Sequence, residues 1–113
     1  MVIESFNTEI EFDKNRVKTK AIIETSFSKE IQILMQEGQS MKEHKTPYPI
    51  LIHVLEGSIE LGVQGIIHSM KSGDIAALKA NVPHNLIAIE NTIIRLTLSK
   101  HDKSERLKEV IGD

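Results

Sequence analysis

Histidine is the residue type with which this sequence could do chemistry. The 113 residues include five histidines and no cysteine, so disulfides, thiol nucleophiles and thiolate zinc sites are excluded, and histidine, aspartate and glutamate remain as strong metal ligands. A neutral imidazole can bind a transition metal, accept a hydrogen bond or exchange a proton near neutral pH. The stretch EHKTPYPILIHVLEG combines His44 with a Pro-Tyr-Pro sequence and an apolar run that ends at Gly57. Which of these roles His44 can take depends on the secondary structure that positions it.

Short strands must position these residues, because the sequence alternates with a period of two over much of its length. In residues 17–27, Val17 and Ile23 share one parity, whereas Lys18 and Lys20 share the other, as expected of a β-strand. The same pattern predicts strands at 31–36, 50–55, 59–63, 66–70, 75–78, 86–89 and 93–98. Turn residues that tolerate positive φ or fix φ separate them, including Gly38, Gly57, Gly65, Gly73 and Asn81-Val82-Pro83. This spacing predicts an all-β sandwich or barrel.

The two ends of the chain are expected to add smaller elements to a single domain that covers residues 1–113. Residues 1–16 alternate weakly, so we expect an edge segment that adds a strand to this sheet or to that of a neighbouring molecule. At 102–111 we expect a short C-terminal helix, since Asp102 can cap its first turn and Gly112 would end it.

Length, charge and hydropathy restrict the partners of this domain. With 113 residues and 40% hydrophobic content, the chain can bury one core but not two. Fourteen basic and 16 acidic residues give a net charge of −2, so no overall field favours nucleic acid or an anionic membrane surface. The first residues do not have the pattern of a secretory signal, and the apolar stretches fall short of the about 20 residues that span a membrane. A cytoplasmic protein is therefore expected.

From Gly38 onward the sequence resembles the cupin superfamily, small double-stranded β-helix barrels of the jelly-roll kind. The glycine, histidine and closing glycine of the first cupin motif correspond to Gly38, His44 and Gly57. The second motif corresponds to Gly73, Asp74 and His84, with Lys79, Asn81 and Ala88 where the family has proline, glycine and asparagine. The two motifs cover residues 38–88. The resemblance implies an all-β, double-stranded β-helix (jelly-roll) barrel.

The resemblance also implies where a metal would bind. In metal-binding cupins, two histidines and a glutamate of the first motif join the histidine of the second around one divalent ion, and the corresponding positions here hold His44, Thr46, Ile50 and His84. Only the two histidines are metal ligands, and such sites usually need three or more protein ligands. We expect either no cofactor or a weakly held zinc, iron, nickel or manganese ion at His44 and His84, with water or substrate completing its shell.

The same alignment suggests a ligand pocket at one end of the barrel. Its expected residues are His44, Thr46, Tyr48, Ile50 and His84. Tyr48 lies between two prolines that restrict the backbone, so it would form a wall of the pocket or simply cover the end of the barrel. Without a metal, the two imidazoles would hydrogen-bond an anionic or hydroxylated ligand, or else only water and neighbouring groups.

Two further histidines are not expected to join this pocket. His53 lies three residues from Ile50, so alternation places it on the opposite face of the strand unless a bulge follows Pro49. We expect it to be hydrogen-bonded at a packed interface. His68 is expected to be a half-buried strand residue.

The interior and the outer surface of the barrel can also be assigned. The interior should be lined by Met35, Met41, Ile50, Ile52, Val54, Met70 and Leu86. Leu51 and Leu55 make the strand at 50–55 apolar on its outer face too, so we expect this face to meet another sheet or the second subunit of a homodimer. Lys14, Arg16, Lys18 and Lys20 share one parity. They could hold an anion or an acidic partner, although such a face is usually only solvated.

Three functions fit these residues. The favoured one is a binding module, a small dimeric cupin that holds a small molecule in the barrel with or without a metal. The second is a metal-dependent cupin enzyme of the dioxygenase or isomerase type that uses His44 and His84. The third is a structural barrel with a vestigial site.

Overall fold

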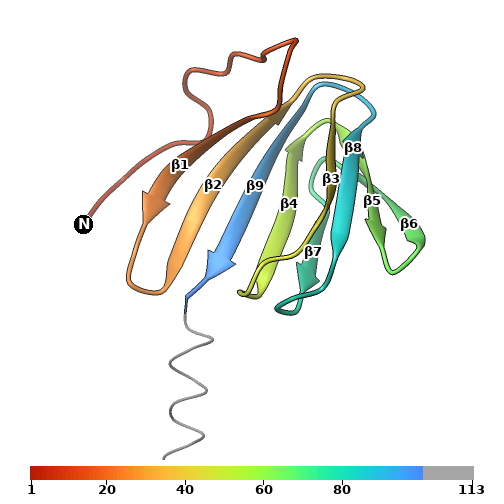
Figure 1. The fold of residues 1–113 in the computed structure, drawn as a ribbon. Coiled ribbons are helices and arrows are strands. Elements are labelled where there is room, and N and C mark those ends of the chain that lie inside the picture. The colour runs from red at the N-terminus through yellow and green to blue at the C-terminus, as the bar shows by residue number, and fades with distance from the viewer. Residues whose placement is uncertain (101–113) are drawn as a thin grey trace, which may run out of the picture.

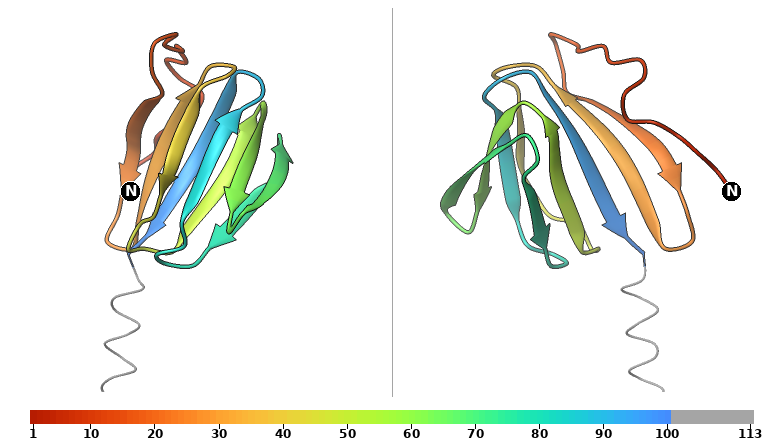
Figure 2. Two further views of the ribbon diagram at one scale, coloured as in Figure 1. Left: turned by 45° about the vertical axis from the view of Figure 1, so that its right-hand side comes forward. Right: turned by 180° about the vertical axis from the view of Figure 1, so that it is seen from behind.

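Residues 1–100, which the computed structural model describes, form two antiparallel β-sheets packed face to face (Figures 1 and 2). The strands are β1 Lys18–Glu24, β2 Ser28–Met35, β3 Ser40–His44, β4 Ile50–Glu56, β5 Ser58–Val63, β6 Ile66–Lys71, β7 Ile75–Leu78, β8 His84–Ala88 and β9 Thr92–Ser99. One sheet has the order β1-β2-β9-β4-β7 and the other β3-β8-β5-β6. The predicted all-β class is therefore confirmed. Within residues 1–100 there is no helix that is long and apolar enough to cross a membrane.

Every predicted strand has a counterpart, and the structure adds β3. This strand was not predicted because it lacks apolar alternation: of its five residues, only Met41 is partly buried. Antiparallel pairing with β8 places it in the sheet. The predicted helix at 102–111 lies outside the described residues.

The N-terminal segment, residues 1–17, forms no strand, so the expected edge strand is wrong within this chain. The segment runs beside β1 and β2, where side chains rather than a backbone ladder hold it. Gln32 Nε2 donates to Phe6 O at 3.0 Å and Lys18 Nζ donates to Glu11 O at 2.7 Å. Near the end of this segment, Asp13 O accepts a hydrogen bond from Gln39 Nε2 at 2.7 Å.

The core lies between the two sheets. Along β4, buried and more exposed residues alternate, with Ile50, Ile52 and Val54 inside and Leu51 39% exposed. Of the predicted interior residues, six are buried in the core cluster and Met41 is partly buried against it, so this prediction is confirmed. Full burial of a side chain of this size contributes about 1.5–3 kcal/mol. The cluster therefore fixes the two sheets relative to each other.

Two turns require a left-handed backbone. Gly57, between β4 and β5, has φ +97°, and a Cβ at this position would lie 2.4 Å from Asn91 O. Asn81, between β7 and β8, has φ 66°, a conformation that asparagine tolerates better than most residues. Its N–H donates to Thr46 O at 2.7 Å. This bond joins the loop before β8 to the loop after β3, next to the strand ends that carry the two motif histidines.

A buried carboxylate occupies the outer face of the five-stranded sheet. Glu30 is 8% exposed and accepts hydrogen bonds from Arg95 Nε at 2.9 Å, Thr97 Oγ1 at 2.6 Å and Ser28 Oγ at 3.0 Å. Burial alone would raise the pKa of Glu30, but the hydrogen bonds from Arg95, Thr97 and Ser28 lower it below its usual value. The carboxylate is thus ionised and held between β2 and β9.

Candidate functional site

Two histidines from different motifs meet at the end of the β3–β8 ladder. His44 is the last residue of β3, His84 is the first residue of β8, and they are register partners. Their ring centroids lie 4.4 Å apart, with 57° between the ring planes. His84 is 3% exposed, whereas His44 is exposed. The pair therefore extends from the interior of the protein to its surface.

Each ring bonds through Nδ1 to the backbone carbonyl of the residue two positions earlier in the chain. His44 Nδ1 lies 2.7 Å from Lys42 O, and His84 Nδ1 lies 2.9 Å from Val82 O. Because a carbonyl oxygen can only accept, Nδ1 carries the proton of each neutral ring and Nε2 carries the lone pair. A backbone carbonyl often fixes the tautomer of metal-binding histidines in this way. The two Nε2 atoms are thus acceptors or potential ligands.

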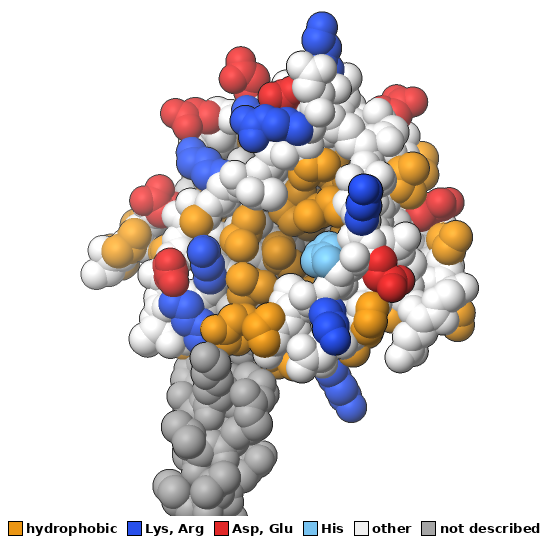
Figure 3. Space-filling view, viewed as in Figure 1, with side chains coloured by type: hydrophobic (Ala, Val, Ile, Leu, Met, Phe, Trp, Pro, Cys, Tyr) orange, Lys and Arg blue, Asp and Glu red, His pale blue; other side chains and the backbone are white. Residues whose placement is uncertain are grey.

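The pair borders a small apolar cavity between the sheets. Its lining residues are Ile33, Met41, His44, Ile52, His84, Leu86, Ile94 and Leu96, and its volume is about 20 Å³. A cavity of this size holds about one water molecule. In Figure 3, a histidine side chain lies beside a hollow lined by hydrophobic side chains. A ligand larger than one water molecule would have to extend out of this cavity toward the surface, where His44 is exposed.

The other three predicted pocket residues are not among those that line the cavity. Thr46 Oγ1 donates to Tyr48 O at 2.8 Å, so this hydroxyl stabilises the Pro-Tyr-Pro loop, in which Tyr48 is half-buried. Ile50 is a core residue that also lines a groove of about 960 Å³ at the ends of β4, β7 and β9. Of the five predicted pocket residues, the cavity brings together His44 and His84.

His53 and His68 lie away from this pair. His53 is on the face of β4 opposite the interior residues, beside Ile75 and Arg95 in the register. Its buried Nδ1 has no hydrogen-bond partner within residues 1–100, so the predicted hydrogen bond is wrong for this atom. His68 is exposed rather than half-buried, although Met70, which has the same parity on β6, is buried.

Comparison with known proteins agrees with the all-β fold. The family model described as "Cupin domain" matches residues 31–99, which include His44 and His84. The chain belongs to the cupin family. This assignment confirms the resemblance noted in the sequence.

Several solved cupin structures are similar to this one. An RmlC-like cupin protein from Desulfovibrio desulfuricans is 20% identical, with a TM-score of 0.80 over 88% of this cupin and 96% of that chain. An RmlC-like cupin family protein from Methanocaldococcus jannaschii is 16% identical, with a TM-score of 0.76 over 94% and 96% of the two chains. A cupin 2 conserved barrel domain protein from Leptotrichia buccalis is 28% identical, with a TM-score of 0.73 over 80% of this chain and 44% of that one. None of the curated proteins matches the sequence.

The donor set of this cupin does not fit a resident metal centre. The positions that hold the other two ligands in metal-binding cupins carry Thr46, whose hydroxyl donates to the backbone, and Ile50, which is apolar and 3% exposed. In the described part of the chain, no three His, Cys, Asp or Glu side chains are grouped so that they could hold a metal ion. An ion at this site would depend on His44 and His84 alone, whereas zinc sites have three or four protein ligands.

Proposed function

We propose that this cupin binds a small hydroxylated or N–H-bearing molecule in the hollow beside His44 and His84. The supporting observation is the pair of imidazoles, 4.4 Å apart, whose Nδ1 atoms are both engaged by backbone carbonyls. The two Nε2 lone pairs accept hydrogen bonds from a ligand donor, and the apolar lining contacts the rest of the ligand. An anionic ligand would require a proton on Nε2, so neutral rings favour donors over anions.

A binding screen with hydroxylated probes tests this proposal. Catechol, glycerol and glucose are added in thermal-shift measurements, and a binding probe should raise the melting temperature as its concentration rises above Kd. His44→Ala should abolish the shift. His68→Ala is the matched control, because His68 is an exposed histidine on β6, and it should bind like the wild type. Equal binding by His44→Ala would refute the proposal.

Elemental analysis separates this function from the two alternatives. For protein purified without a histidine tag, we expect far less than one equivalent of transition metal. A full equivalent that is lost in both His44→Ala and His84→Ala would support the metal-dependent enzyme instead. If these variants are more stable than the wild type while no probe and no metal binds, the site is vestigial.

A further inference from the structure

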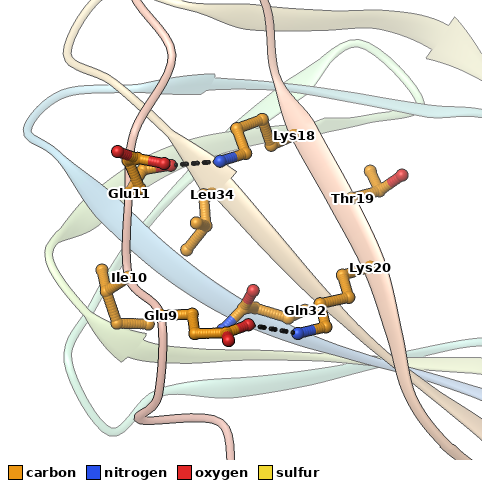
Figure 4. Close-up of a pocket in the computed structure, with 8 residues that line it drawn as sticks. All are labelled: Glu9, Ile10, Glu11, Lys18, Thr19, Lys20, Gln32 and Leu34. Atoms are coloured by element: carbon orange, nitrogen blue, oxygen red, sulfur yellow. Dashed lines mark hydrogen bonds and ion pairs between the residues drawn. The ribbon is translucent and has the colours of Figure 1, made fainter.

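A second pocket lies between the N-terminal segment and the outer face of β1 and β2 (Figure 4). Its volume of about 550 Å³ is within the range of small-molecule sites, about 300–1,000 Å³. The pocket is separate from the histidine pair. Ile33 lines the cavity at His44 and His84, whereas its neighbours Gln32 and Leu34 line this pocket, and successive residues of a strand point to opposite faces of the sheet.

The floor of the pocket combines a buried amide with an apolar side chain. Gln32 is 3% exposed and Leu34 is 2% exposed. Gln32 Nε2 donates to Phe6 O at 3.0 Å, and its amide oxygen is turned toward the space enclosed by the N-terminal segment and β1 (Figure 4). Ile10 adds an apolar side chain from the N-terminal segment. This floor can contact an apolar group and accept a hydrogen bond.

Two lysines on one face of β1 supply positive charge. Lys18 Nζ donates to Glu11 O at 2.7 Å, which leaves two of its three donors for a ligand, and none of the ion pairs within residues 1–100 includes Lys18. Lys20 Nζ lies 3.0 Å from Glu9 Oε1, with side chains 54% and 79% exposed. Exposed pairs of this kind are weak, so an anionic ligand can replace Glu9 at Lys20.

The backbone of Glu9, in the N-terminal segment, has a left-handed conformation. Its φ of 56° lies in the left-handed region, which is unusual for a residue other than glycine and is often found at ligand sites. Glu9 is exposed, so packing of its side chain does not explain the conformation. The contact with Lys20 places this carboxylate at the position that a bound anion would take.

We propose that the pocket binds a small monocarboxylate with an apolar tail. Its carboxylate replaces that of Glu9 and contacts Lys18 and Lys20, and its tail lies on Ile10 and Leu34. Two glutamates and two lysines line the pocket, so the lining has no excess positive charge to offset a second negative charge on the ligand, and a monoanion is favoured over a dianion.

The probe for this site is sodium hexanoate, titrated into the full chain and followed by 1H–15N NMR. Saturable shifts are expected in the amides of residues 9–11 and 18–20. The double variant Lys18→Gln, Lys20→Gln should raise Kd by about tenfold or more, the effect of losing hydrogen bonds to a charged group. Glu9→Gln should lower Kd because it removes the competing carboxylate. Lys14→Gln is the matched control, since Lys14 precedes β1 and does not line the pocket, and its Kd should not change.

The following outcomes would contradict the proposal or one part of it. An unchanged Kd in the double lysine variant, or the absence of saturable shifts, would overturn the proposal. Equal binding of hexan-1-ol or of inorganic phosphate would overturn the assignment to monocarboxylates. His44→Ala should leave hexanoate binding unchanged, and a loss in this variant would place the ligand at the histidine pair instead.

Discussion

Glu30→Gln is expected to destabilise the fold strongly, since it removes the charge on which three hydrogen bonds converge. Loss of one partner from a fully buried ion pair costs about 3–5 kcal/mol. The Arg95 side chain is 42% exposed, whereas that of Glu30 is 10% exposed. Solvent therefore screens part of this interaction, and we expect a loss of about 2–3 kcal/mol in the free energy of unfolding. For a chain of this length, the melting temperature should fall by about 10 °C.

The effect of Glu30→Gln should depend on pH. Folding lowers the pKa of Glu30 below its ordinary value of 4.5. Its contribution to stability is therefore fully present above pH 4.5 and is lost as the pH falls through the lower pKa of the folded state. The difference in unfolding free energy between wild type and variant should be constant from about pH 7 to about pH 5 and should narrow in more acidic solution.

Urea denaturation followed by circular dichroism measures both effects. Glu24→Gln is the control, because Glu24 also pairs with a basic side chain, that of Lys100 at 2.6 Å, but in a more exposed position, and its replacement should change stability little. The double variant Glu30→Leu, Arg95→Met should be more stable than Glu30→Gln, since it leaves neither charge unpaired. If Glu30→Gln loses less than about 0.5 kcal/mol, or if its deficit is the same at acidic pH, the carboxylate does not stabilise the fold as described.

Two further predictions concern a turn and the oligomeric state. Gly57→Ala should lower the free energy of unfolding, measured by urea denaturation, by about 2–4 kcal/mol, because the residue has an unfavourable φ and its added Cβ would lie against Asn91 O. Gly38→Ala has the same sign of φ but open space around it, so it should lower this free energy by only about 1–2 kcal/mol. Equal losses would show that the contact with Asn91 does not contribute. Light scattering should give twice the monomer mass of 12.7 kDa if the exposed Leu51 on the outer face of β4 is buried in a homodimer, and Leu51→Glu should restore the monomer. A monomeric wild type at micromolar concentration would contradict this expectation.

The strands that could be predicted are those with one buried face. β4 and β8 alternate between buried and more exposed residues, and this alternation is visible in the sequence. β3 could not be found in this way because its sequence SMKEH has one partly buried residue, and its place depends on backbone pairing with β8. The order of strands in the two sheets is also a property of pairing between distant segments, which periodicity does not report.

The candidate site was predictable to the extent that the cupin motifs place its histidines. Motif position, rather than spacing along the chain, indicated that His44 and His84 meet. It did not indicate that Thr46 bonds the backbone of its own loop, since a hydroxyl has several partners within reach. The sequence indicated Lys18 and Lys20 as two of four cations that could hold an anion, but it did not indicate the pocket around them, because the N-terminal segment that closes this pocket is held by side chains and has no periodic pattern.

The two histidines differ in how firmly their strands are held in the sheet. His84 belongs to β8, which is paired on both sides, whereas His44 belongs to β3, which has β8 as its single neighbour. A strand with one neighbour can fray while the rest of the protein stays folded. His84 is therefore the more firmly held of the two, and His44 can move with β3. If the pair binds a ligand as proposed, the size of the ligands that it accepts would depend on the local stability of β3 and would not require any change in the core.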